Sequence, residues 1–401
     1  MGSVRVDQLL STGEVVLDFD RKLSNAEKFD ALATALPGAS RERLAGVNVV
    51  RWRDQAILYK QVTYLGIPWE SYKKRIQIPN TWLNAYDEIA ARGLQPRFVG
   101  IYEHNSVVLF VDFDPILYIQ RKANNSAAHV ATNDLYQALV HGAFERTDKN
   151  FNRLTAVRSD RFASYLDGTY DGSDNRFQIF EDLNEQLFTG DFIYGLDAVK
   201  EMHNANWPDR FQNEWAGFYL EYAFNALAEQ DPQRYQVEFV KNKIAGSLDF
   251  DLVWRTPTRT IDYLGDLKAS DYTQRDALGN DAISLDRAIQ EYGKFWYVIY
   301  EHETRHARDF GDQATVEWNE WRRCHGHVQR KQYDPLSYRA KYKESVRFIG
   351  MKVLEVNEAN KGFVLGDFHQ GAQPSGAARA KKVSIKKKQM DNFLVYQSVA
   401  T

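Results

Sequence analysis

Cysteine is nearly absent from this 401-residue sequence, which contains only Cys324. A single thiol cannot form an internal disulfide, and it cannot supply a zinc site made of several thiolates. So little cysteine is typical of a reducing compartment, and the sequence therefore favours a cytoplasmic location. The chain also lacks an apolar run of membrane-spanning length, so we expect no transmembrane helix and no membrane partner.

The motifs of several common enzyme classes are missing as well. The sequence has no Gly-x-Ser-x-Gly elbow, no P-loop and no dinucleotide-binding glycine fingerprint. These absences remove the commonest hydrolase, NTPase and dehydrogenase assignments. The remaining composition, with 44% hydrophobic and 13% aromatic residues, is that of an ordinary folded protein.

The length of the chain predicts two domains. A polar segment at residues 160–190, which contains Gly168, Gly172 and Gly190, is the expected place of the boundary. We therefore expect an N-terminal domain at residues 1–185 and a C-terminal domain at residues 186–401. The net charge of −3 argues mildly against nucleic-acid binding. Clustered basic residues and a bias of metal sites toward carboxylates offset that argument.

Two short segments in the C-terminal half carry the pattern with the clearest chemistry. Residues 247–254 and 261–270 both alternate like strands, and the polar connector between them suits a turn. In this predicted hairpin, Asp251, Asp266 and Lys268 lie on a common face. Carboxylates on adjacent strands form an oxygen-ligand site for Mg²⁺. The metal supplies hydroxide and offsets the charge of a phosphodiester transition state, while a nearby lysine holds or deprotonates the attacking water.

An Asp followed fifteen positions later by Asp-x-Lys resembles the PD-(D/E)xK nuclease superfamily, which includes many type II restriction endonucleases. The matching residues are Asp251, Asp266 and Lys268; the proline of the motif's name is missing. Asp249 competes with Asp251 for the first carboxylate position, and the sequence leaves this choice open. Taken alone, the hairpin is also compatible with an ordinary surface ion pair between Asp266 and Lys268.

The flanking segments fit the same resemblance. Residues 213–228 have the period of a helix, and Gly217 and Glu221 match a Gly-x-x-x-Glu element whose glutamate joins the metal site in that superfamily. Gly217 further suggests that this helix packs closely against a neighbour. Residues 284–303 show an apolar stripe that predicts one long amphipathic helix. Helix, strand, strand and helix is the order that the superfamily's core requires.

The N-terminal half contains candidate DNA contacts. Residues 64–79 interleave aromatic and basic side chains, a combination suited to phosphate contact and base stacking. A second segment, at residues 121–126, is rich in donors for phosphates and base edges. The expected DNA-binding residues are Lys73, Lys74, Arg75, Arg121, Lys122, Asn124 and Asn125.

The resemblance implies an α/β (α+β) protein with a restriction-endonuclease-like central mixed β-sheet flanked by helices, and a separate N-terminal α+β recognition domain. It implies a Mg²⁺-dependent, sequence-specific endonuclease of double-stranded DNA in a bacterial or archaeal cytoplasm. Asp251, Asp266, Glu221 and Asp249 are the expected metal ligands, with Lys268 completing the catalytic set. A homodimer is expected, because cutting both strands calls for two active sites.

Three alternatives stay open at this point. A structure-selective or repair nuclease uses the same motif. A modification-dependent endonuclease requires a base-flipping pocket, for which Trp52, Tyr64, Trp69 and Trp82 are available. A DNA-binding protein without enzymatic activity has no use for Asp266 and Lys268 together.

Overall fold

A computed structural model describes residues 4–121, 126–148, 150–172, 174–208, 210–241, 250–256, 258–327, 342–368 and 381–400. The chain divides into two compact units, Met1–Gly172 and Ser173–Thr401. The boundary expected at residues 185 and 186 falls inside helix α6 (Gln178–Leu187), whose Ile179, Phe180 and Leu183 are buried in the core of the second unit. The structure therefore places the division before α6.

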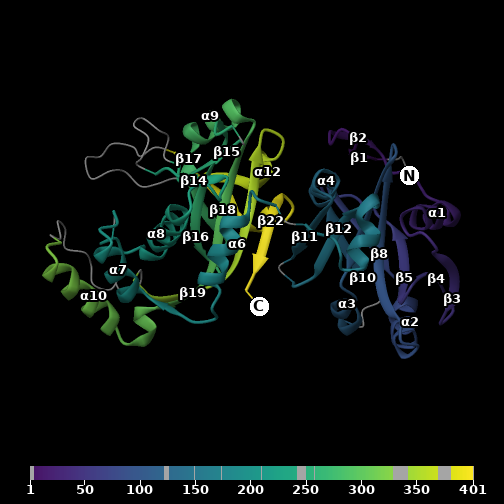
Figure 1. Cartoon of the computed structure of the whole chain (residues 1–401), viewed down its shortest axis with the longest axis horizontal. Coiled ribbons are helices and arrows are strands. Elements are labelled where there is room, and N and C mark those ends of the chain that lie inside the picture. Colours follow the sequence, from purple (N-terminus) through teal and green to yellow (C-terminus); the bar gives the residue numbers. More distant parts are fainter. Residues whose placement is uncertain are drawn as a thin grey trace. The chain divides into compact units, whose positions relative to one another are not determined.

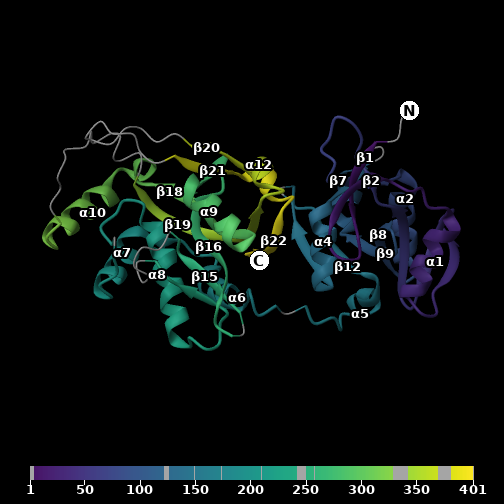
Figure 2. The ribbon, with the colours of Figure 1, turned by 90° about the horizontal axis from the view of Figure 1, so that it is seen from above.

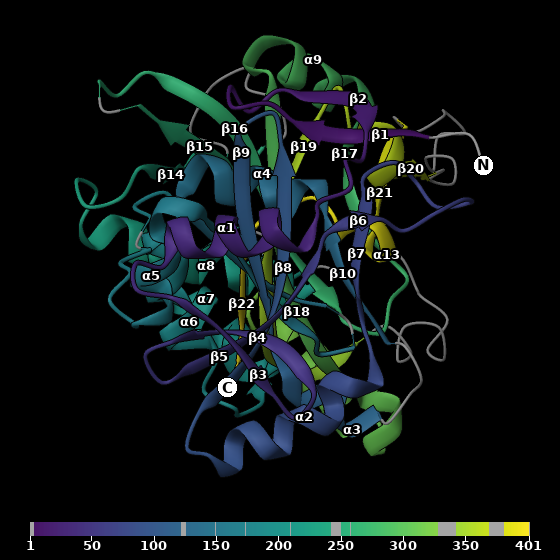
Figure 3. The ribbon, with the colours of Figure 1, turned by 90° about the vertical axis from the view of Figure 1, so that its right-hand side faces the viewer.

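The first unit is built on a seven-stranded sheet with the order β11-β12-β9-β8-β5-β4-β3. Only β5 and β8 pair in parallel among these neighbours. Helix α1 (Asn25–Ala35) lies across one face of this sheet, with Leu32 buried against Val50 and Ile57 (Figure 3). The strands are β3 (Ser40–Leu44), β4 (Val47–Trp52), β5 (Gln55–Gln61), β8 (Gln95–His104), β9 (Val107–Phe113), β11 (Ala143–Thr147) and β12 (Arg153–Arg158).

Smaller sheets and helices complete the first unit. Strands β1 (Arg5–Leu9) and β2 (Val15–Phe19) form a hairpin, and β10 (Ser126–Ala131), β7 (Lys73–Ile78) and β6 (Thr63–Tyr64) form a three-stranded sheet. The remaining helices are α2 (Asn80–Ala91), α3 (Pro115–Arg121), α4 (Thr132–His141) and α5 (Phe162–Leu166).

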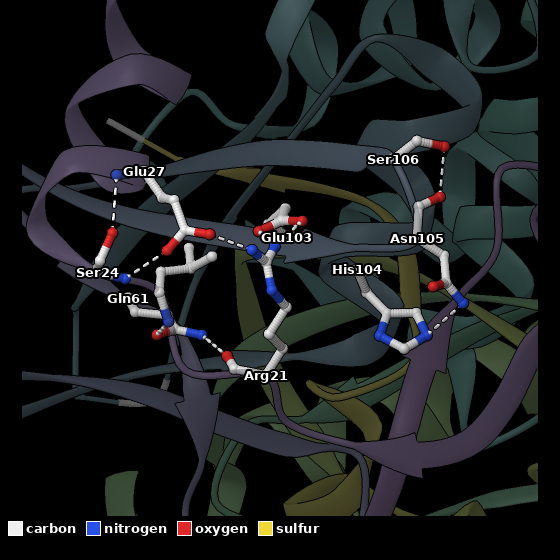
Figure 4. A network of polar contacts seen from close by, with 9 residues as sticks. Arg21, Ser24, Glu27, Gln61, Glu103, His104, Asn105 and Ser106 are labelled. Carbon is white, nitrogen blue, oxygen red and sulfur yellow. Dashed lines mark hydrogen bonds and ion pairs between the residues drawn. The ribbon is translucent and has the colours of Figure 1, made fainter.

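Helix α1 begins with a capping box. The Ser24 hydroxyl accepts a hydrogen bond from the Glu27 backbone N–H, and the Glu27 carboxylate accepts one from the Ser24 N–H at 2.8 Å. Arg21 forms ion pairs with Glu27 and with Glu103 of β8 (Figure 4). The network thereby ties the start of the helix to the sheet that the helix covers.

The second unit contains another seven-stranded sheet, with the order β13-β19-β18-β16-β15-β14 and β22 paired to β19. Strands β16 and β18 are parallel, and the other pairs are antiparallel (Figure 1). The strands are β13 (Ile193–Tyr194), β14 (Val237–Phe239), β15 (Leu252–Arg255), β16 (Ile261–Asp271), β18 (Lys294–His306), β19 (Lys343–Asn357) and β22 (Leu394–Val399).

A three-stranded sheet, β17 (Asp276–Asp281), β21 (Lys382–Lys386) and β20 (Leu365–Phe368), forms a further part of this unit (Figure 2). The helices besides α6 are α7 (Gly195–Asn204), α8 (Trp215–Gln230), α9 (Ala282–Tyr292), α10 (Gln313–Cys324), α12 (Lys361–Val364) and α13 (Lys387–Met390). Both units mix helices with sheets, which confirms the α/β (α+β) class. The likeness to a restriction-endonuclease fold stays a prediction.

The single long helix expected at residues 284–303 is wrong. Helix α9 ends at Tyr292, where Gly293 adopts a left-handed conformation with φ of 77° and donates its N–H to the Ile289 carbonyl. The chain then continues as β18, whose residues 295–300 are fully buried. A central strand that is buried on both faces favours such an unbroken aromatic and β-branched run.

Candidate active site

The predicted hairpin is formed by β15 and β16. Leu252 pairs with Gly265 in the antiparallel register, so Asp251, one residue earlier, lies at the position opposite Asp266. Asp251 Oδ2 accepts a hydrogen bond from the Leu267 backbone N–H at 3.2 Å, and this N–H also lies 3.1 Å from Asp266 Oδ1. The two carboxyl groups therefore converge, as the alternation of the strands predicts.

Gly265 fixes the approach of β16 to its neighbours. A Cβ atom at this position would lie 2.5 Å from the Trp254 ring and 2.6 Å from the Trp296 carbonyl oxygen. Both distances are shorter than side chains tolerate, so a glycine is required directly before Asp266. Tight packing of this kind holds the strand, and with it the carboxylate, in one position.

Lys268 follows on the same face of β16, with its Nζ 2.5 Å from Asp266 Oδ2. Burial acts to raise the pKa of Asp266, but the Lys268 ammonium and hydrogen bonds with Asp251 and Asn280 hold this pKa below its ordinary value. Burial acts in turn to lower the pKa of Lys268, and the carboxylates of Asp266 and Asp251 outweigh it, so that this pKa is raised. The lysine is therefore a cation at neutral pH, a state suited to charge stabilisation rather than to proton abstraction.

The pKa of Asp251 shifts in the opposite direction to that of Asp266. Its side chain is almost fully buried, and burial together with the negative charges of Asp266 and Glu221 raises its pKa well above the ordinary value. A hydrogen bond between the two side chains contributes to both shifts, raising the pKa of Asp251 and lowering that of Asp266. Pairs of carboxyl groups whose environments push their pKa values apart are typical of catalytic sites.

Helix α8 places Glu221 beside this pair. The side chain is buried; burial and the charge of Asp266 raise its pKa, whereas Lys241 acts to lower it. Both oxygens of Glu221 accept hydrogen bonds from Lys241 Nζ, at 2.7 and 2.8 Å. The expected close packing around Gly217 is wrong for the residues that the structure describes, because none of them has an atom within 4 Å of a Cβ placed there.

Three further residues of the site were not indicated by any motif in the sequence. Lys241 follows β14 in a stretch with no motif, and its Nζ lies 3.7 Å from Asp251 Oδ1. Asn280 on β17 hydrogen-bonds to Asp266, and the Tyr297 hydroxyl accepts the Asn280 backbone N–H at 3.3 Å. Tyr297 pairs with Asp266 in the parallel register of β16 and β18, a contact hidden by the prediction of a helix there.

The donor set suits a divalent cation, but its ligands are not gathered into a cage. In the described part of the chain, no group of three or more His, Cys, Asp or Glu side chains is arranged to hold a metal ion. Instead, the ammonium groups of Lys241 and Lys268 contact the carboxylates of Glu221, Asp251 and Asp266. Buried carboxylates that raise one another's pKa are stabilised by a nearby cation, and carboxylate oxygens are the ligands Mg²⁺ prefers. Asp249 lies outside the described residues.

The predicted DNA-binding residues of the first unit separate into two groups. Lys73 and Arg75 alternate along β7 with Lys74, so they lie on the opposite face of the strand. Lys73 pairs with Glu70 at 2.8 Å and lies 5.0 Å from the ring of Trp69, which is itself half exposed. An exposed aromatic ring beside Lys73, with Arg75 on the same face of β7, keeps both residues as candidates for phosphate contact.

The prediction for Lys74 is corrected by the structure. Its side chain is fully buried, and its Nζ lies 3.6 Å from Asp20 and 5.8 Å from the Tyr102 ring centroid. A buried ammonium cannot reach a DNA backbone without breaking this environment. Arg121 ends α3, and the structure describes only its backbone. Lys122, Asn124 and Asn125 lie outside the described residues.

The aromatic residues considered for a base-flipping pocket are also divided. Trp52 and Trp82 are buried, Trp52 in the core under α1 and Trp82 against Phe98. Tyr64 donates a hydrogen bond to the Trp69 carbonyl oxygen. The four rings therefore do not line one pocket, because two of them belong to the packed interior.

A family model described as Methylase-associated X1 matches residues 53–166. The match lies within the first unit and covers less than a third of the 401 residues. It associates this region with methylases and so indicates a restriction-modification context. No curated protein and no solved structure matches the chain. No helix among the described residues is both long enough and apolar enough to span a membrane.

Proposed function

We propose that the chain is a Mg²⁺-dependent endonuclease of double-stranded DNA that acts in a restriction-modification system. The observation that carries the proposal is the convergence of Asp251, Asp266, Lys268 and Glu221 in one buried site of the second unit. The Methylase-associated X1 match to the first unit supports it independently. Restriction requires a nuclease that works beside a methylase.

The proposed roles follow from the charges of the residues. Asp266, Asp251 and Glu221 would hold the metal, which supplies an activated water and offsets negative charge on the phosphodiester. Lys268 stays protonated beside Asp266, so it would orient the attacking water and stabilise the phosphate as its charge grows. Water adds to phosphorus, one P–O bond breaks, and the departing oxygen takes up a proton.

The first unit would recognise DNA through the face of β7 that carries Lys73 and Arg75. Sequence specificity and a homodimer with two active sites belong to the same proposal. Both are consistent with a type II restriction enzyme. The modification-dependent alternative is weakened by the burial of Trp52 and Trp82, since neither ring is available to stack on a flipped base.

Plasmid cleavage tests the proposal directly. Unmethylated and methylated plasmids are incubated with the purified chain in Mg²⁺ or in EDTA, with Asp266→Asn as the inactive control. We expect discrete fragments from unmethylated DNA in Mg²⁺ alone. Cutting only of methylated DNA would replace the proposal with the modification-dependent reading. Absence of cutting across plasmids of varied sequence, by protein that binds DNA, would refute the nuclease assignment.

A further inference from the structure

Lys241 occupies an unusual position between two of the carboxylates assigned to the metal. Its Nζ lies 2.7 and 2.8 Å from the two oxygens of Glu221 and 3.7 Å from Asp251 Oδ1. The lysine comes just after β14, outside the hairpin that carries the Asp-x-Lys motif. The Lys241 ammonium therefore lies directly on two of the proposed metal ligands.

Two ammonium groups already contact the carboxylates of this site. Lys241 contacts Glu221 and Asp251, and Lys268 contacts Asp266. A divalent cation on the same carboxylates would add two positive charges beside the Lys241 ammonium. Like charges at such short range repel strongly in a medium of low dielectric, so the metal and the Lys241 ammonium cannot share these oxygens.

Lys241 is anchored differently from Lys268, although the two side chains are similarly exposed, at 31% and 26%. Among the described residues, its Nζ contacts the ends of the Glu221 and Asp251 side chains and lies 5.4 Å from the Phe218 ring centroid, and the residue comes after the end of the short strand β14. Lys268 lies on the central strand β16, with its Nζ 2.5 Å from Asp266 Oδ2. A flexible four-carbon stem lets an ammonium swing toward solvent, where a phosphate backbone would lie.

We propose that Lys241 is a resident cation that competes with the divalent metal for Glu221 and Asp251, and that metal binding releases it from these carboxylates. The inference rests on the proposed function for its metal. It makes Lys241 a positioning residue, which keeps two buried carboxylates neutralised until the metal arrives. Removing the lysine should therefore strengthen metal binding and weaken the metal-free protein.

Calorimetric titration of Mg²⁺ into the full chain without DNA tests the competition. We expect Lys241→Met to bind Mg²⁺ at least tenfold more tightly than wild type, which corresponds to about 1.4 kcal/mol. The metal-free variant should melt at a lower temperature, and Mg²⁺ should raise its melting temperature more than it raises that of wild type. Mg²⁺ affinity equal to or weaker than wild type would overturn the inference.

Lys352→Met is the matched control. Lys352 also bridges two carboxylates, with Nζ 3.3 Å from Glu301 and 3.0 Å from Asp391, and it is a partly exposed residue of the same unit. Its loss should lower the melting temperature without changing the affinity for Mg²⁺. A similar gain in metal affinity from Lys352→Met would mean that any loss of positive charge strengthens Mg²⁺ binding. Competition by Lys241 in particular would then be refuted.

A second measurement uses the wild-type chain, so it does not depend on the folding of a variant. An amine-reactive reagent should modify Lys241 faster in Mg²⁺ than in EDTA, with Lys352 as the internal reference, as read by peptide mass spectrometry. Equal modification of Lys241 in both conditions would overturn the inference. A wild-type chain that cuts DNA while Lys241→Met shows unchanged Mg²⁺ affinity refutes only this inference. Tighter Mg²⁺ binding without any cleavage refutes only the proposed nuclease function.

Discussion

Replacing Lys268 with methionine should separate catalysis from DNA binding. The Lys268 ammonium lies 2.5 Å from a carboxylate that is only 1% exposed. At an effective dielectric constant of about 20, the gross attraction of this pair is about 7 kcal/mol. The net loss is smaller, since breaking a buried pair costs about 3–5 kcal/mol. We expect about 3 kcal/mol, because Lys268 is 26% exposed and water screens part of the attraction.

That loss predicts a fall of roughly 6–12 °C in the melting temperature of the second unit. Cleavage should fall by at least about a hundredfold, the usual effect of removing one group that stabilises a developing negative charge. DNA binding, measured by gel shift on the same preparation, should persist. The double variant Asp266→Asn with Lys268→Met should recover most of the stability, because no charge is left unpaired, and it should remain inactive.

Near wild-type cleavage by Lys268→Met would show that the Asp-x-Lys assignment is wrong and that the pair is an ordinary ion pair. An unchanged melting temperature of Lys268→Met would contradict the geometry from which the magnitude is derived. Recovery of cleavage by the double variant would equally refute the assignment, since stability would then be the only role of the two residues.

Three further predictions concern DNA, metal and acid. Replacing Lys73 and Arg75 with alanine should weaken DNA binding and reduce its salt slope by roughly two, because two phosphate contacts are lost; an unchanged slope removes β7 from the interface. The pKa of Asp251 is raised, so a proton on this carboxyl group opposes metal binding at low pH. Mg²⁺ affinity should therefore rise with pH, by up to about tenfold per unit, until Asp251 has lost its proton. Calorimetry should find this pH dependence lost in Asp251→Asn. Burial lowers the pKa of His302 to about 3, so the unfolded state binds the extra proton and stability should fall as pH drops from about 6.5 toward 3, by up to about 1.4 kcal/mol per unit. Urea unfolding should show that His302→Gln flattens this fall, whereas replacing the exposed His325 leaves it unchanged.

The local patterns of the active site could be predicted from the sequence. The alternation in residues 247–254 and 261–270 is a property of each strand alone, and it places Asp251 and Asp266 on one face. The helix that carries Glu221 has its own period, and it was likewise predictable. A motif that consists of short segments with fixed spacing can be found without knowing what packs around it.

The tertiary surroundings could not be predicted. The apolar residues of α9 and β18 keep a helical spacing across Gly293, and a short buried strand cannot be distinguished from a helix by its period. This ambiguity concealed Tyr297 from the site. Lys74 lies between Lys73 and Arg75 in the same basic segment, but strand alternation turns its side chain inward toward Asp20. Lys241 has no motif at all, and only the fold brings it to Glu221.

The place of β16 between β15 and β18 also governs when the site comes into existence during synthesis. A ribosome that has released residue 268 has exposed the whole Asp-x-Lys motif, but β18, which packs Tyr297 beside Asp266, has not yet been made. Parallel pairing requires α9 to cross over first, so this contact is long-range and closes late in folding. Before that contact forms, Asp266 lacks one of the two strands that bury it. The full desolvation of the carboxyl groups therefore depends on a strand that follows the motif in the sequence.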